Sequence, residues 1–292
     1  MQTQIVPETA FPPSPQELTP PVQRLYYRGE LSRLAEPAVS IVGSRKAGTQ
    51  GCFHARQFAE ALAQSGVTVV SGLALGIDAA AHRGALRSGR TIAVLAHGLD
   101  QVYPPEHQVL AAEILDAGGL LLSEYPDGVS PRPHYFLHRN RLIAWAGLGV
   151  VVIEAGHRSG ALSTAIAALE LGREVMVVPG PVSGGHYSGG HRLIRDGALL
   201  VERAEDVLQA CGQGRLRLTP AAQDPAGGPR LLKAQDPRAI AIAAVLDFQP
   251  NDPAALCHQS GLSMADLMAG LLLLELEGYA QRLIDGRWSL RP

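Results

Sequence analysis

The fold is decided by residues 38–78, which read AVSIVGSRKAGTQGCFHARQFAEALAQSGVTVVSGLALGID. Two continuously apolar runs rich in β-branched residues, 38–42 and 67–71, flank a segment with helical spacing that ends at Gly66. An uninterrupted apolar run is typical of a strand that is buried on both faces. The stretch therefore predicts a strand, a crossover helix and a second strand parallel to the first.

The same alternation of apolar runs and helical segments continues along the chain. Five further runs have the composition of buried strands, namely 91–96, 120–124, 149–154, 174–179 and 198–202. Seven strands separated by helices predict an α/β fold with an extended, Rossmann-like, doubly wound and mainly parallel sheet.

The composition changes on both sides of this sheet. Residues 1–37 begin with many prolines, which lack an amide donor, and we expect a proline-rich N-terminal arm there. The sheet domain is expected over 38–212, and the Gly- and Pro-rich residues 213–236 predict a flexible linker. A compact pattern over 237–292 predicts a small C-terminal winged-helix domain with three helices and a two-stranded wing.

Composition also restricts the classes of function. The formal net charge of −2 argues against a protein coated in positive charge, so any nucleic-acid site must be local. No apolar run approaches the ~20 residues that cross a bilayer, so we expect a cytoplasmic protein without membrane insertion. The three cysteines are far apart and form no C-x-x-C pair, so we expect no metal site. The glycine-rich loops match no nucleotide-binding pattern, and no cofactor is expected.

The loops that follow the predicted strands are the first place to look for a binding site. In an open parallel sheet, ligands bind beyond the carboxyl ends of the strands, where the strand order reverses. Ser44 and Arg45 follow the first strand, Ser71 and Gly72 follow the second, and Ser159-Gly160 opens a helix. Backbone amides and hydroxyls at such positions can hold a phosphate. Tight turns and ordinary helix capping explain the same residues equally well.

The most informative loop is PRPHYFLHRNR, residues 131–141. No acidic residue lies between Asp127 and Glu154, so its three arginines and two histidines create a positive field around Tyr135 and Phe136. Single-stranded DNA needs cations for its phosphates and aromatic faces for its bases. Solvated arginines around a core phenylalanine are the alternative interpretation, and the composition favours neither.

Taken together, these loops resemble the DprA/Smf family of DNA-processing proteins over about Tyr26 to Leu208. The motifs that carry the resemblance are GSR at 43–45, SGLALGID at 71–78, TIAVLAHGLDQVYP at 91–104, SEYP at 123–126, F-x-x-RNR at 136–141, SGALSTA at 159–165, PG at 179–180 and LIRDGA at 193–198. The later stretch LLLLELEGYAQRLIDGRW is similar to the winged-helix domain that ends many family members.

The resemblance implies a non-enzymatic protein that binds single-stranded DNA without sequence preference. It implies that the protein protects incoming strands, loads the RecA recombinase during natural transformation and recombination, and forms a homodimer. Carried onto this chain, the implied DNA-binding residues are Ser44, Arg45, Ser71, Gly72, Phe136, Arg139, Asn140, Ser159 and Gly160. Arg132 is added from its neighbourhood. Ser44 and Arg45 would hold phosphate, and Phe136 would stack on a base.

A nucleotide-processing enzyme is one alternative, because related Rossmann-like folds cleave nucleoside monophosphates with the help of acids. Here Glu124 and Glu154 end predicted strands, and Asp78 and His82 lie four residues apart on one helical face. Such an enzyme would use a P-G-G-x-G-T loop, whereas Pro179-Gly180 continues here as Pro-Val. The simpler expectation is that Asp78 complements a helix N-terminus and pairs with His82 one turn away.

A transcription regulator acting through the winged helix is the other alternative. The predicted helices of that domain carry Asp266, Glu275 and few cations, whereas duplex DNA requires phosphate-binding charge. We therefore expect this domain to serve protein contact or regulation.

Overall fold

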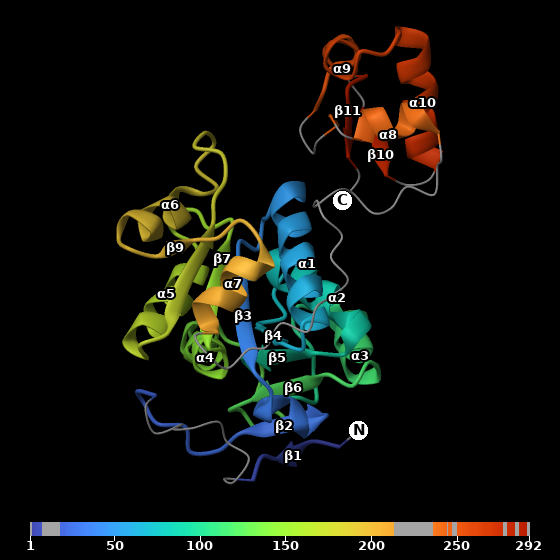
Figure 1. The fold of residues 1–292 in the computed structure, drawn as a ribbon. Helices are drawn as coiled ribbons and strands as arrows, with labels where there is room; N and C mark the ends of the chain where they lie inside the picture. Colours follow the sequence, from blue (N-terminus) through green and yellow to red (C-terminus); the bar gives the residue numbers. More distant parts are fainter. Residues whose placement is uncertain are drawn as a thin grey trace. The chain divides into compact units, whose positions relative to one another are not determined.

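The computed structural model describes residues 2–7, 18–212, 236–243, 245–246, 250–276, 279–283 and 286–290. The chain forms two compact units, Met1–Ala221 and Ala222–Pro292, and each has a hydrophobic core of its own (Figure 1). The linker expected over 213–236 lies outside the described residues except for Asp236.

The larger unit is built on a nine-stranded sheet with the order β1-β2-β6-β5-β4-β3-β7-β8-β9. The strands are β1 Gln4–Ile5, β2 Tyr26–Gly29, β3 Ala38–Gly43, β4 Thr68–Ser71, β5 Thr91–Leu95, β6 Leu120–Ser123, β7 Gly149–Ile153, β8 Glu174–Val178 and β9 Leu199–Leu200. The strands from β3 to β9 are mutually parallel and coincide with the seven predicted runs. The order reverses between β3 and β7, which confirms the doubly wound α/β fold.

Helices cover both faces of the sheet. One face packs against α1 Thr49–Gln64, α2 Ile77–Ala85, α3 Gln108–Asp116 and α7 Ala204–Cys211, and the other packs against α4 Pro133–Ala146, α5 Ala161–Glu170 and α6 Ser188–Arg195. In β3, Val39 and Ile41 join the core under α1, whereas Ala38 and Val42 join the core under α4. Both faces of the strand are buried, which explains why its sequence is apolar without alternation. No helix in the described part of the chain is long and apolar enough to span a bilayer.

The N-terminal segment differs from the expectation of an arm outside the sheet. Residues 26–29 form β2, which pairs antiparallel with β6 on one side and with β1 on the other. Leu18 and Leu25 are buried in the core of the larger unit. The many prolines of the segment drew attention away from the proline-free run YYRG, whose free amides can pair with a neighbouring strand on each side.

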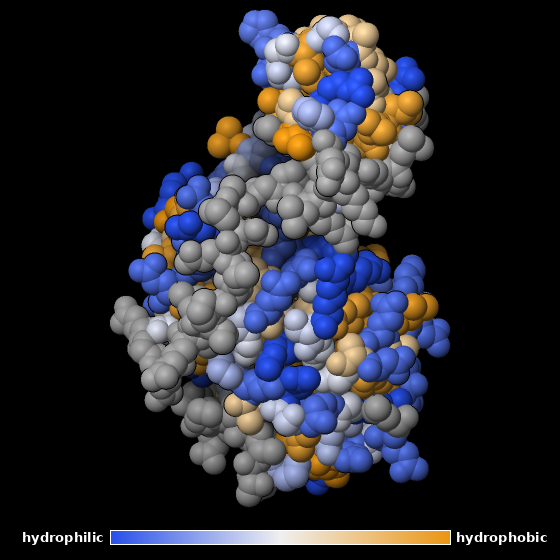
Figure 2. All heavy atoms as spheres, turned by 45° about the vertical axis from the view of Figure 1, so that its right-hand side comes forward, coloured by the Kyte–Doolittle hydropathy of each residue, from blue (hydrophilic) through white to orange (hydrophobic). Residues whose placement is uncertain are grey.

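The smaller unit is a winged helix, as predicted. It consists of α8 Pro237–Ala243, α9 Pro253–Ser260, α10 Met264–Leu276 and the antiparallel pair β10 Ala280–Arg282 and β11 Trp288–Leu290. Hydrophobic residues are visible on its surface in Figure 2. On α10, Met264, Met268 and Leu272 are 48%, 36% and 53% exposed, so this helix presents an apolar stripe to solvent.

Candidate nucleic-acid interface

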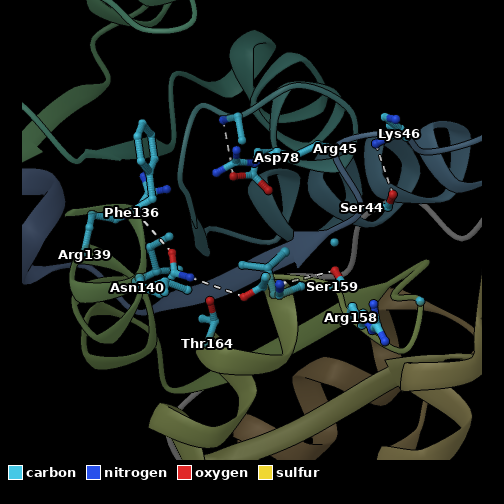
Figure 3. A pocket seen from close by; sticks show the side chains of 18 of the residues that line it. Ser44, Arg45, Lys46, Asp78, Phe136, Arg139, Asn140, Arg158, Ser159 and Thr164 are labelled. Atoms are coloured by element: carbon cyan, nitrogen blue, oxygen red, sulfur yellow. Dashed lines mark hydrogen bonds between the residues drawn. The ribbon is translucent and has the colours of Figure 1, made fainter. Parts of the chain in front are cut away.

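A cavity of about 560 Å³ opens at the carboxyl ends of β3 and β7, where the strand order reverses. Its walls are the loop after β3, the first half of α4 and the loop between β7 and α5 (Figure 3). Seven of the residues implied by the family resemblance line it, namely Ser44, Arg45, Phe136, Arg139, Asn140, Ser159 and Gly160. Ser71, Gly72 and Arg132 are not among the described lining residues.

The ring of Phe136 lies close to two guanidinium groups at this cavity. The Arg45 guanidinium carbon is 5.2 Å from the ring centroid, and that of Arg139 is 5.9 Å away. The ring of Tyr103 lies beside it, with 5.6 Å between centroids. α4 begins at Pro133, so Phe136 lies on its first turn. Its ring lines the cavity there and is half-buried. The arrangement offers an aromatic face with positive charge beside it.

Arg139 has a different position from the other cations because its side chain is buried. Its Nη1 donates to the Gly72 carbonyl at 2.7 Å and also to the Val94 carbonyl. Burial lowers the pKa of Arg139 to about 10, and the nearby carboxylate of Asp78 opposes that change. A Cβ at Gly72 would lie 2.6 Å from the guanidinium nitrogens, so a larger residue there would displace the Arg139 head group from its carbonyl partners. Arg139 therefore ties the ends of β4 and β5 beneath the cavity.

The loop after β4 forms the floor of the cavity and is held from several sides. Asp78 accepts hydrogen bonds from the amides of Gly72 and Ala74, at 3.0 and 3.4 Å. Leu73 has a positive φ of 55° and is fully buried. Its amide donates to His82 Nε2 at 3.3 Å, and its carbonyl accepts from His107 Nδ1 at 2.8 Å.

His82 therefore does not pair with Asp78, contrary to the expectation from their spacing. Thr91 donates its hydroxyl to the Val69 carbonyl, so it accepts from His82 Nδ1 at 2.7 Å and leaves Nε2 free to accept from Leu73. Burial lowers the pKa of His82 to about 3, so the imidazole is neutral at physiological pH. Asp78 is also buried, which raises its pKa, while Arg139 acts in the opposite direction.

The hydroxyl and amide side chains at the cavity are partly committed to local structure. Asn140 Nδ2 donates to Ser163 Oγ at 2.8 Å and so joins α4 to the start of α5. Ser159 Oγ accepts from the Ala161 amide at 3.3 Å, and Ser44 Oγ accepts from the Lys46 amide at 3.1 Å. Ser71 is fully buried and donates to the Ile41 carbonyl at 2.6 Å, which fixes β4 against β3.

Three lining residues with basic side chains were not predicted from the sequence, namely Lys46, His157 and Arg158. All three have exposed side chains, and within the described residues neither Lys46 nor Arg158 forms an ion pair. Figure 3 places Lys46 and Arg158 on different walls of the cavity. Lys46 directly follows the GSR motif, and Arg158 directly precedes the SGALSTA motif. Their position beside a predicted binding loop is the sequence feature that could have identified them. The rim is more cationic than the sequence analysis indicated.

The acids that an enzyme would need are engaged elsewhere. Both carboxylate oxygens of Glu154 accept from the Gly48 amide at 2.9 Å, at the N-terminus of α1. Burial raises the pKa of Glu154, and the residue is not among the described lining residues of the cavity. Glu124 accepts from Arg141 Nη2 at 2.6 Å. Among the described residues, no group of three His, Cys, Asp or Glu side chains could hold a metal ion.

Two family models match the chain. Residues 2–212 match the model of DNA recombination-mediator protein A, and residues 220–286 match the DprA winged helix domain. The chain is 43% identical over 266 residues to the putative DNA processing protein DprA of Mycobacterium tuberculosis. That match covers 89% of this chain and 66% of the mycobacterial protein, which is just under two thirds of its length.

Two solved structures have the same fold. The DNA processing protein A of Streptococcus pneumoniae is 40% identical with a TM-score of 0.66, covering 71% of this chain and 73% of that one. The protein from Helicobacter pylori is 29% identical with a TM-score of 0.65, covering 71% of this chain and 94% of that one. The Helicobacter structure was described as revealing a single-stranded DNA binding mode.

Proposed function

The chain belongs to the DNA recombination-mediator protein A family, also called DprA/Smf, and on this premise we propose that it binds single-stranded DNA in the cavity between β3 and β7. The observation that carries the proposal is the half-buried ring of Phe136 with the Arg45 guanidinium 5.2 Å from its centroid. An unpaired base needs an aromatic face, and the adjoining phosphate needs a cation.

The charge distribution around the cavity favours a strand backbone as ligand. Arg45, Lys46 and Arg158 are exposed at the rim, and within the described residues none of them has an acidic partner. The acid among the described lining residues is Asp78, which is buried beside Arg139. Binding through phosphates and stacked bases reads no base edge, so the interaction is independent of sequence.

The relatives support the same proposal, since the Helicobacter protein binds single-stranded DNA by the description of its structure. We propose that this chain likewise acts as a cytoplasmic, non-enzymatic mediator that protects incoming strands and loads RecA during natural transformation and recombination. Of the implied DNA-binding residues, Arg45 and Phe136 would contact the strand, together with Ser44, Asn140, Ser159 and Gly160. Ser71, Gly72 and Arg139 would shape the floor, and Arg132 would act at the outer end of α4.

A homodimer is part of the proposal. Leu199 and Leu200 form the short edge strand β9 and are 44% and 49% exposed, which is unusual for two adjacent leucines in a strand. Sheet edges with exposed apolar residues favour pairing with a second copy. Size-exclusion chromatography with light scattering should give twice the chain mass, and Leu200→Asp should give the mass of one chain.

The winged helix is proposed to bind protein and not duplex DNA. In place of phosphate-binding cations, α10 presents Met264, Met268 and Leu272, with Asp266 and Glu275 on the same helix. Apolar stripes of this kind bind protein partners.

The main test is fluorescence anisotropy with labelled oligo-dT and a matching duplex at two salt concentrations. We expect tight, salt-sensitive binding to the single strand and weaker binding to the duplex. Phe136→Ala should raise Kd by roughly five- to 150-fold, because base stacking contributes ~1–3 kcal/mol. Phe136→Leu preserves apolar volume without an aromatic face and should weaken binding similarly.

Arg87→Ala is the matched control for a cation variant such as Arg158→Ala. The side chain of Arg87 is 63% exposed and pairs with Glu60 of α1, which covers the face of the sheet opposite α4. Its loss should leave Kd unchanged. If folded wild-type protein does not bind the single strand, or if Phe136→Ala binds as well as wild type does, the proposal is wrong.

A further inference from the structure

A second cavity, of about 530 Å³, lies against the other face of α4. Phe136, Asn140 and Ile143 line the first cavity, whereas His138 and Arg141 of the same helix line the second. At 100° per residue these two sets lie on opposite faces of the helix. The second cavity also includes Glu124 and Tyr125, which follow β6, so the binding edge of the sheet continues on this side of α4.

The second cavity contains buried hydrogen-bonding groups without partners. Arg141 has only 9% of its side chain exposed and donates from Nη2 to Glu124 Oε1 at 2.6 Å. Among the described residues, its Nε and Nη1 have no hydrogen-bond partner, and neither does Glu124 Oε2, which lies 3.5 Å from His138 Nδ1. Unsatisfied buried groups of this kind are costly. Both residues line the cavity, so a small shift of their side chains toward it would let a ligand with an acceptor and a donor side by side satisfy both.

The charges and rings of this cavity define the chemistry of that ligand. Glu124 and Arg141 neutralise one another, so their free atoms match the uncharged polar edge of a nucleobase, which carries the required acceptor and donor. Arg24 also lines the cavity, is exposed and has no ion pair among the described residues, so it offers a cation to a phosphate of the same strand. Tyr125 stacks on Tyr135, with ring centroids 4.3 Å apart and planes inclined by 29°. The guanidinium of Arg132 lies 5.8 Å from the Tyr135 ring. These rings supply the face on which a base stacks.

We propose that the second cavity holds a further nucleobase of the strand that enters the first, so that the strand crosses the first turn of α4 from Phe136 to Tyr125. This inference rests on the proposed function. Arg132 and His134 are exposed on that turn and would lie beside the connecting phosphate. Tyr135 and Phe136 are consecutive, so the two aromatic platforms serve neighbouring parts of one strand.

The test measures Kd by fluorescence anisotropy for a series of oligo-dT fragments of increasing length. The shortest fragment fills only the first cavity. For wild type, affinity should keep rising with length past the point at which the first cavity is filled. In Tyr125→Ala and Tyr125→Leu, Kd for the longer oligomers should rise about tenfold, while Kd for the shortest fragment stays within about twofold. Phe136→Ala should weaken binding at every length.

Tyr27→Ala is the matched control, because Tyr27 is a half-buried tyrosine of β2 outside both cavities. An oligomer with abasic sites at its outer positions should bind wild type and the Tyr125 variants equally, which separates base from phosphate binding. Identical length dependence in wild type and both Tyr125 variants would overturn this inference and leave the proposed function standing. Failure of wild type to bind any length would overturn both.

Discussion

Replacing Arg139 by methionine removes the buried cation beneath the cavity while keeping much of its volume. Two carbonyls, those of Gly72 and Val94, lose their side-chain donor. The buried carboxylate of Asp78 loses its stronger cationic neighbour and keeps the two backbone amides and the weaker field of Arg45. Removing one partner of a buried charge pair leaves the other charge uncompensated, which costs ~3–5 kcal/mol.

The expected loss is therefore about 4 kcal/mol of unfolding free energy for the larger unit. For a domain of this size, each kcal/mol corresponds to roughly 2–4 °C, so Tm should fall by about 10 °C. Arg87→Met is the control, because Arg87 makes an exposed pair that contributes at most about 1 kcal/mol.

The loss should depend on pH with a definite sign. Burial raises the pKa of Asp78 above its ordinary value of 3.8, and without Arg139 that pKa should rise further. A group that binds its proton more tightly in the folded state destabilises the fold above its folded pKa and ceases to do so below its unfolded pKa. The deficit of Arg139→Met should be full at neutral pH and should shrink as the pH falls toward about 4.

Urea unfolding followed by tryptophan fluorescence measures this deficit. Of the two tryptophans, Trp145 is buried in the larger unit and Trp288 in the smaller, so Trp288→Phe leaves a signal from the larger unit alone. The Asp78→Asn background should reduce the cost of Arg139→Met. A deficit below about 1 kcal/mol at pH 7, or one that is constant with pH, would refute the structural role of Arg139.

Three further predictions concern binding and chemistry. Arg45→Ala removes one phosphate contact, so the slope of log K against log salt should become shallower by about 0.7; an unchanged slope in titrations over several salt concentrations would contradict that contact. Residues 237–292, which lie in the smaller unit and contain its core, should show no tight duplex binding in anisotropy, and strong binding would restore the transcription-regulator alternative. Incubation with nucleoside monophosphates should release no free base by chromatography, and release that disappears in Glu154→Gln would favour the enzyme alternative.

Much of the fold was predictable because strand burial leaves a strong signal. Seven runs such as AVSIV and GVVVIE are mostly apolar without alternation, and each became a parallel strand. The strands β1 and β2 were not predicted, because they are only two and four residues long and none of their residues is fully buried, so they leave no apolar run in the sequence. β2 pairs with β6, which is distant in sequence, and no local pattern encodes that contact.

The candidate site was predictable in its position and less so in the roles of its residues. Strand ends and motifs located Arg45, Phe136 and Ser159 at one cavity. Sequence could not distinguish Arg45, which is exposed at the rim, from Arg139, which is buried against two carbonyls. Both are arginines beside the ring of Phe136, and only the path of each side chain shows that Arg45 can contact the DNA whereas Arg139 stabilises the floor of the cavity.

The floor of the cavity determines how fast a strand can bind. Leu73 is fixed through its amide by His82 and through its carbonyl by His107, so the loop already has its shape before DNA arrives. Association then does not wait for a loop to order, and encounter between the strand and the cationic rim limits the on-rate. In stopped-flow experiments the observed rate should grow in proportion to DNA concentration without reaching a plateau, and salt should slow association by screening the rim.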